Sequence, residues 1–184
     1  MLEQEFADVL RAAQAGGAWA WRRLHDDLAG QVLGYIRAQG AREPDDLLAE
    51  VFLQLARNIH SFEGVEKGFR SWVFQIAHNR VIDERRRLRR NPVDPTDTIA
   101  DLLPDEGDVT AGEVIDSSQA ERIRALILKL VPAQRDVLLL RILSGLTVPE
   151  IAAVVGKSEG AVKALQRRGL AALGKHLESE GIPR

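Results

Sequence analysis

The chain has 184 residues, of which 45% are hydrophobic and 28% are charged, a balance typical of a globular protein. It contains no cysteine, which excludes disulfides and thiolate metal sites. Its apolar runs are all shorter than the roughly 18–20 residues that span a membrane, and its acidic N-terminus is unlike a signal peptide. We therefore expect a cytoplasmic protein.

The overall charge of −2 is unevenly distributed along the chain. The net charge is −3 over residues 1–60, +4 over 61–90, −8 over 91–118 and +5 over 119–184. Two basic blocks separated by an acidic stretch indicate two surfaces for a polyanion. Two solvated helical faces beside an acidic linker would explain the same pattern, and charge alone does not separate these explanations.

Helical periodicity dominates residues 1–90, and almost no stretch alternates with the period of a strand. A first helix ends at Gly16-Gly17, a second covers 18–39, and a third begins at Pro44, because proline suits the first turn of a helix. A fourth helix runs from about Phe69 into the arginine-rich stretch 85–90.

Aromatic and amide side chains gather on the fourth predicted helix, ahead of the arginines. Phe69 and Trp72 precede Gln75, Asn79 and Arg80. Aromatic rings and amides beside positive charge suit unstacked single-stranded bases. A helical aromatic residue is more often part of the core, so we expect at least one of Phe69 and Trp72 to be buried.

Residues 91–118 contain three prolines, two glycines and no positive charge. Such a segment repels itself and has too few apolar residues for a core of its own. It is predicted to be a flexible acidic linker that reaches about 90 Å when extended. This length suits two domains, 1–90 and 119–184, held apart on a larger partner.

The second domain is predicted to contain a helix, a tight turn and a second helix. Thr147 and Glu150 form a capping box for a short helix over 148–155, which closes at Gly156. Ser158 then caps a last helix, whose polar side carries Glu159, Lys163, Gln166, Arg167 and Arg168. This is the pattern of a DNA-binding helix-turn-helix. A plain helical hairpin with a solvated basic face remains the alternative.

Several segments resemble the extracytoplasmic-function (ECF) sigma factors of the sigma-70 family. Residues 45–52 and 69–83 resemble sigma region 2, whereas 130–141, 145–152 and 158–163 resemble region 4. The resemblance covers nearly the whole chain in the family's order. It implies an all-α protein with a four-helix region 2 domain and a helix-turn-helix region 4 domain, and we expect no further domain after region 4.

The resemblance also implies a role for each matching position. The residues expected to bind core RNA polymerase are Asp45, Asp46, Glu50, Gln54 and Arg57. Those expected to capture the −10 element and the phosphates upstream of it are Phe62, Glu63, Gly64, Lys67, Trp72, Asn79, Arg80, Arg85, Arg86, Arg87, Arg89 and Arg90. Those expected to read the −35 element are Ser158, Glu159, Lys163, Gln166, Arg167 and Arg168.

The partners implied are bacterial core RNA polymerase and promoter DNA, with which the protein would join the nucleoid, and an anti-sigma factor is typical of the family. We expect no cofactor, metal, membrane or small-molecule substrate. An enzyme is disfavoured because the four histidines follow no metal-ligand spacing and no glycine-rich phosphate loop appears. The alternatives are a helix-turn-helix regulator that binds duplex DNA without core polymerase and a protein-interaction module such as an anti-sigma antagonist.

Overall fold

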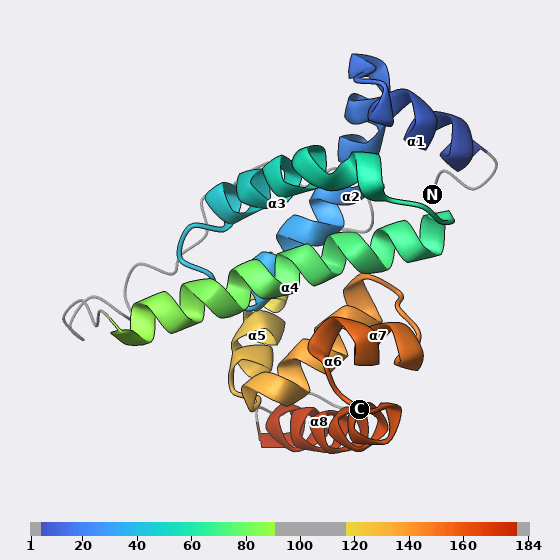
Figure 1. The fold of residues 1–184 in the computed structure, drawn as a ribbon. Helices are drawn as coiled ribbons and strands as arrows, with labels where there is room; N and C mark the ends of the chain where they lie inside the picture. The colour runs from blue at the N-terminus through green and yellow to red at the C-terminus, as the bar shows by residue number, and fades with distance from the viewer. Residues whose placement is uncertain (1–4, 91–116, 180–184) are drawn as a thin grey trace.

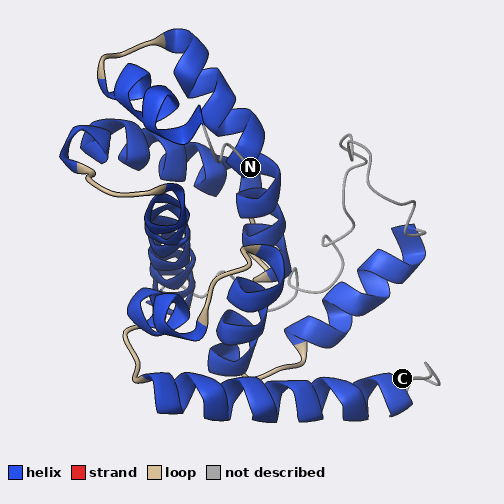
Figure 2. Cartoon of the chain, turned by 90° about the vertical axis from the view of Figure 1, so that its right-hand side faces the viewer, coloured by secondary structure: helices blue, strands red, loops and turns tan. Residues whose placement is uncertain are grey.

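The computed structural model describes residues 5–90 and 117–179, and within them all regular structure is helical (Figure 1, Figure 2). The first part contains α1 (Phe6–Gln14), α2 (Ala18–Ala38), α3 (Pro44–Asn58), the 3₁₀ turn η2 (Ile59–Ser61) and α4 (Glu66–Arg90). The second contains α5 (Ser117–Leu128), α6 (Pro132–Leu143), α7 (Val148–Val155) and α8 (Glu159–Ser179). The all-α prediction is confirmed.

The predicted linker over 91–118 lies outside the described residues, apart from its last two residues, which begin α5. Across 5–90 and 117–179, none of the helices is both long and apolar enough to cross a bilayer.

The first domain is held by the apolar faces of α2, α3 and α4, which share one core. Leu24, Leu28 and Val32 of α2 are fully or almost fully buried, as their helical spacing predicts. Helix α4 begins at Glu66, three residues before the predicted start, and continues as helix to Arg90. The arginine-rich stretch is therefore the last turn and a half of a long helix, so its side chains project around a rigid axis.

In the second domain, local interactions at the helix ends determine where α7 begins and ends. The Glu150 carboxylate accepts hydrogen bonds from the backbone N–H and the hydroxyl of Thr147, both at 2.6 Å. This predicted capping box fixes the start of α7, and Gly156, in the left-handed conformation with φ +62°, ends it. Helix α8 then lies against α6, and Gly169 leaves room there for Leu138 and Gln134 of α6.

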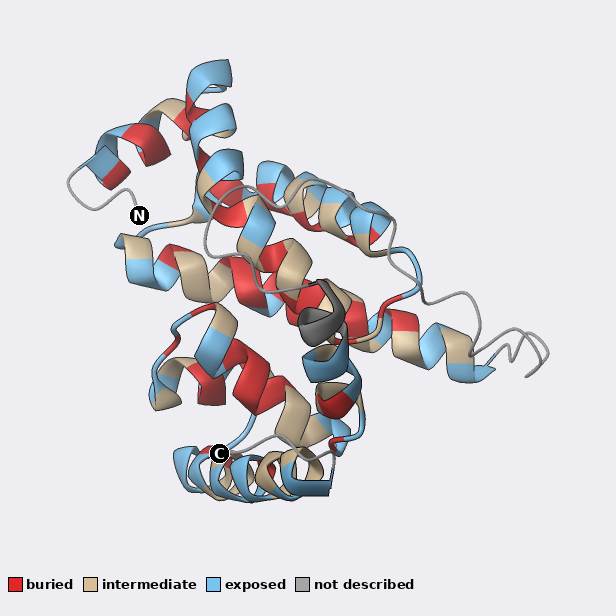
Figure 3. Cartoon of the chain, turned by 180° about the vertical axis from the view of Figure 1, so that it is seen from behind, coloured by how far each residue is buried: buried red, intermediate tan, exposed pale blue. Residues whose placement is uncertain are grey.

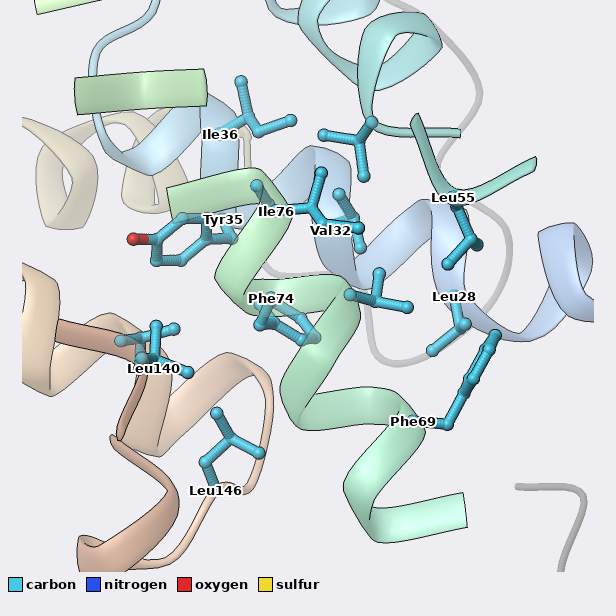
Figure 4. Close-up of a cluster of buried hydrophobic side chains, with 14 of the residues drawn as sticks. Leu28, Val32, Tyr35, Ile36, Leu55, Phe69, Phe74, Ile76, Leu140 and Leu146 are labelled. Carbon is cyan, nitrogen blue, oxygen red and sulfur yellow. The ribbon is translucent and has the colours of Figure 1, made fainter. Parts of the chain in front are cut away.

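The two domains pack directly against each other. Helix α7 contacts α4 and α6 contacts α2. Buried residues of both domains form one continuous apolar cluster, and Leu140 and Leu146 lie on the side of α4 that carries Phe74 (Figure 4). Figure 3 shows buried residues, in red, in the helices of both parts of the chain. The linker length suits domains held apart on a larger partner and left the arrangement of the free protein open; in the structure the two domains are packed together in a closed arrangement.

Candidate nucleic-acid interface

The outward face of α8 is basic and its inward face is apolar. Val162 is fully buried, whereas Lys163, Arg167 and Arg168 are exposed. Ser158 Oγ accepts a hydrogen bond of 3.3 Å from the N–H of Ala161, as expected of a helix cap. Of the other residues predicted at this surface, Glu159 is exposed and Gln166 is half-buried. Together α7, the Gly156 turn and α8 form a helix-turn-helix with exposed cations on its second helix.

An aromatic cluster supports the loop between η2 and α4. The rings of Phe62 and Trp72 stack with centroids 5.3 Å apart and an interplanar angle of 14°. Phe69 meets Phe62 edge-on at 5.2 Å and is almost fully buried, which confirms that one aromatic residue of α4 belongs to the core. Gln14 Nε2 donates 3.0 Å hydrogen bonds to the carbonyls of Ile59 and Phe62, and these fix the start of the loop.

The remaining residues predicted for the −10 element differ in exposure. The exposed ones are Glu63, Gly64, Lys67, Asn79, Arg86, Arg87, Arg89 and Arg90. Gln75, which the sequence placed with Asn79 among the residues suited to unstacked bases but which the resemblance did not include, is also exposed, one turn before Asn79. Trp72, Gln75 and Asn79 follow the i, i+3, i+7 pattern of one helix face.

The predicted polymerase-binding residues share an exposed face of α3. Four of the five, Asp45, Asp46, Glu50 and Arg57, are exposed, and Gln54 is half-buried. Leu53, which is not in the predicted set, is 56% exposed in the middle of this face. Its position outside the buried apolar stripe of the helix can be read from the sequence.

Arg80 connects the α3 face to α4. Its Nη2 donates a 2.6 Å hydrogen bond to Gln54 Oε1, and its Nη1 lies 3.7 Å from Glu50 Oε2. A residue predicted to touch DNA is therefore held by two residues predicted to touch polymerase.

Arg85 lies between the two domains, unlike the other arginines at the end of α4. Its Nη1 is 3.4 Å from Asp136 Oδ1, and its Nη2 donates to both the side-chain and the backbone oxygen of Gln39. Gln39 and Asp136 are themselves buried. Burial lowers the pKa of Arg135, which also donates to the Gln39 carbonyl at 3.3 Å.

A polar cleft of about 830 Å³ runs between α4 and the second domain. Its walls include Gln75, Asn79 and Arg86 from α4, and the end of α7 together with Lys157 from the opposite side. Helix α7 and the turn after it thus face the surface of α4 that was predicted to capture the −10 element.

Comparisons with known proteins define the class. The chain matches the family model of Sigma-70 region 2 over residues 18–91 and that of Sigma-70 region 4 over residues 120–173. The fold is similar to the crystal structure of the sigma factor RpoE in complex with the anti-sigma factor NepR from Bartonella quintana, with a TM-score of 0.66, 18% identity, and coverage of 85% of this chain and 96% of that chain.

Two curated relatives narrow the assignment. The ECF RNA polymerase sigma factor SigX of Bacillus subtilis is 31% identical over 163 residues, covering 84% of this chain and 79% of SigX. The sigma factor BldN of Streptomyces coelicolor is 32% identical over 189 residues, covering 94% of this chain and 66% of BldN. The chain belongs to the ECF RNA polymerase sigma factors.

The family assignment carries the function. An ECF sigma factor binds core RNA polymerase and directs transcription initiation at particular promoters, and sigma factors are not a family of catalytic enzymes. The comparisons favour this function over the alternative of a regulator that acts without core polymerase.

Proposed function

We propose that residues 1–90 dock on core polymerase and capture the −10 element, and that residues 119–184 read the −35 element. The observation that carries this assignment is the exposed basic face of α8. This helix follows the capped helix α7 and buries Val162 on its other face. Lys163, Arg167 and Arg168 hold phosphates, and Gln166 reaches base edges in the major groove.

The −10 element is captured by the aromatic loop and the adjoining face of α4. The Phe62–Trp72 stack offers a flat surface on which an unstacked base of the non-template strand packs. Asn79 lies two turns along the same helix face and supplies hydrogen bonds. The exposed arginines at the end of α4 contact the duplex phosphates upstream.

Core polymerase binds the exposed face of α3, through Asp45, Asp46, Glu50, Gln54 and Arg57, with Leu53 as its apolar centre. Charged residues around one exposed leucine match the usual layout of a protein interface, with a polar rim and an apolar centre. The protein acts in the cytoplasm, carries out no catalysis itself and is held inactive by an anti-sigma factor. RpoE, a sigma factor of similar fold, was crystallised in complex with the anti-sigma factor NepR, which supports inhibition by an anti-sigma factor.

The test is run-off transcription with purified bacterial core polymerase on a library of promoter fragments, with and without this protein. We expect new transcripts that share sequence elements near −35 and −10. The double variant Lys163→Ala/Arg167→Ala should lose transcripts that depend on the −35 element while still binding core polymerase. Unchanged promoter use by this variant would contradict the assignment of α8.

A further inference from the structure

Asp136 of α6 is a buried carboxylate whose hydrogen bonds come from the other domain. Its side chain is held by Gln39 Nε2 at 2.9 Å and by Arg85 Nη1 at 3.4 Å. Gln39 follows α2 and Arg85 lies on α4, so both donors belong to the first domain. If the domains separated, Asp136 would lose both donors and become a solvated surface residue. Its interactions therefore serve the closed arrangement rather than the fold of its own domain.

The donors are tied to each other as well as to Asp136. Arg85 donates to the side-chain oxygen of Gln39, and Arg85 and Arg135 both donate to the Gln39 carbonyl, at 3.4 and 3.3 Å. Gln39 is only 2% exposed. Buried polar groups are rarely left without partners, because each unsatisfied group destabilises the folded state. We call these four residues, Gln39, Arg85, Arg135 and Asp136, the interdomain clasp.

The closed arrangement is incompatible with simultaneous reading of two promoter elements. DNA rises about 3.4 Å per base pair, so elements centred near −35 and −10 lie about 85 Å apart along the duplex. In the closed protein α7 contacts α4, and the cleft between them brings Lys157, at the start of the helix-turn-helix turn, opposite Asn79. Promoter binding therefore requires the two domains to separate.

We propose that Arg85 is a switch residue: in the closed protein it holds Gln39 and Asp136 across the domain interface, and on opening it joins the arginines of α4 that bind DNA phosphates. This inference rests on the proposed placement of promoter DNA along α4. The same guanidinium cannot serve both partners at once, so the clasp and the DNA compete for it. The free protein consequently binds promoters more weakly than the open form does, and separation of the domains returns Arg85 to the basic surface of α4, where its four neighbouring arginines are already exposed.

The first experiment measures the domain arrangement without any DNA. Because the chain has no cysteine, fluorophores can be placed on two introduced ones, Arg22→Cys in α2 and Lys175→Cys in α8, both at exposed positions. Asp136→Asn removes the carboxylate charge and should shift the closed-to-open ratio about tenfold towards the open form, seen as lower energy transfer. Arg85→Gln should do the same.

The control for this experiment is Asp83→Asn, which also removes one carboxylate. Asp83 pairs with Arg86 at 3.4 Å on the surface of the same helix, with its side chain 61% exposed. The Asp83→Asn variant should show the same energy transfer as the wild-type protein. Circular dichroism should show equal helix content in all variants. Energy transfer in Asp136→Asn and Arg85→Gln equal to that of the control would overturn the clasp.

The second experiment separates the two roles of Arg85 by promoter binding of the free, full-length protein. Asp136→Asn frees Arg85 and should bind a promoter duplex up to about tenfold more tightly than wild type. Arg85→Gln opens the protein but lacks the phosphate contact. Its promoter affinity should therefore rise less than that of Asp136→Asn, and its slope of log affinity against log salt should be smaller by about one. Equal gains with equal salt slopes in the two variants would overturn the switch.

The energy-transfer experiment is independent of the promoter assignment, because it uses no DNA and reports on the clasp alone. The promoter-binding experiment rests on that assignment, which wild-type run-off transcription tests separately. A protein that transcribes as expected but does not open in Asp136→Asn contradicts only the switch.

Discussion

The Tyr35 hydroxyl of α2 lies 3.0 Å from Nδ1 of His78 in α4, inside the protein. Burial is the main reason that the pKa of His78 lies below its usual value; the nearby Asp136 opposes the shift and Arg85 adds to it. Burial, followed by the charge of Asp136, raises the pKa of Tyr35. Both side chains are therefore neutral near pH 7 and joined by a hydrogen bond next to the interdomain clasp.

This pair makes stability dependent on pH. The usual pKa of histidine is 6.5, and the folded-state value for His78 is lower, so the unfolded chain binds the proton more readily. The contribution is fully present above pH 6.5 and declines as the pH falls towards the folded-state pKa. We expect the free energy of unfolding in urea to drop as the pH is lowered below about 6.5.

A pair of histidine variants checks the source of this pH dependence. His78→Gln should flatten the decline below pH 6.5, whereas His60→Gln, a change at an exposed residue of η2, should keep the wild-type profile. Parallel profiles for wild type and His78→Gln would show that another group is responsible.

Gly169 is predicted to be required for the packing of α8 on α6. A Cβ at this position would lie 2.9 Å from Leu138 Cδ1 and 3.3 Å from Gln134 Cβ. Leu138 is buried and has little room to move. Gly169→Ala should therefore lower the free energy of unfolding by about 1–3 kcal/mol, as overpacked cores do.

The matched control for Gly169 lies in the same helix. A Cβ at Gly160 would meet nothing within 4 Å, so Gly160→Ala should be neutral or stabilising by up to about 1 kcal/mol. Urea denaturation of both variants gives the comparison. Equal stability of the two would mean that α6 and α8 separate enough to admit the methyl group.

Local signals allowed the sequence to predict parts of the fold closely. The span of α7, 148–155, was predicted to the residue, because Thr147 and Glu150 mark its start and Gly156 its end. The start of α4 was placed too late, because Glu66 and Lys67 follow a glycine-containing loop and lack an apolar partner to show the period. Short-range chemistry determines helix ends where caps exist, and leaves them uncertain elsewhere.

Contacts between the domains could not be predicted in the same way. Gln39 and Asp136 are 97 residues apart, and neither disturbs the apolar periodicity of its own helix. Arg85 stands among five arginines within 85–90, and nothing in the sequence separates it from its neighbours. Its partial burial arises from its tertiary contacts with Gln39, at the end of α2, and with Asp136 of α6. Composition could therefore indicate a basic surface but could not show which of the five arginines turns towards the other domain.

Basic residues of α8 should control promoter affinity through phosphate neutralisation. Removal of one phosphate contact, as in Lys163→Ala or Arg167→Ala, should weaken promoter binding by the holoenzyme and reduce the slope of log affinity against log salt by about one. Lys175→Ala removes a similar exposed charge three turns after Lys163 and should leave the slope unchanged. Filter binding across a salt series measures both, and an equal effect of Lys175→Ala would point to a nonspecific charge effect.

Leu53 should contribute to polymerase binding without contributing to the fold. Its side chain is 56% exposed on α3, between Glu50 and Arg57, so truncation leaves no cavity in the core. Apolar residues at the centre of an interface contribute more than 1 kcal/mol when they act as hot spots, and Leu53→Ala should therefore weaken core polymerase binding by about tenfold. Thermal stability should stay at the wild-type value.

Ile142→Ala is the matched change for Leu53, because Ile142 is a 61% exposed aliphatic residue on α6, away from α3. It should bind core polymerase as wild type does in a fluorescence titration. Wild-type affinity of Leu53→Ala would move the docking surface off the centre of α3. Equal losses in both variants would instead mean that exposed aliphatic residues act through general hydrophobic adhesion, because only a specific interface distinguishes the two positions.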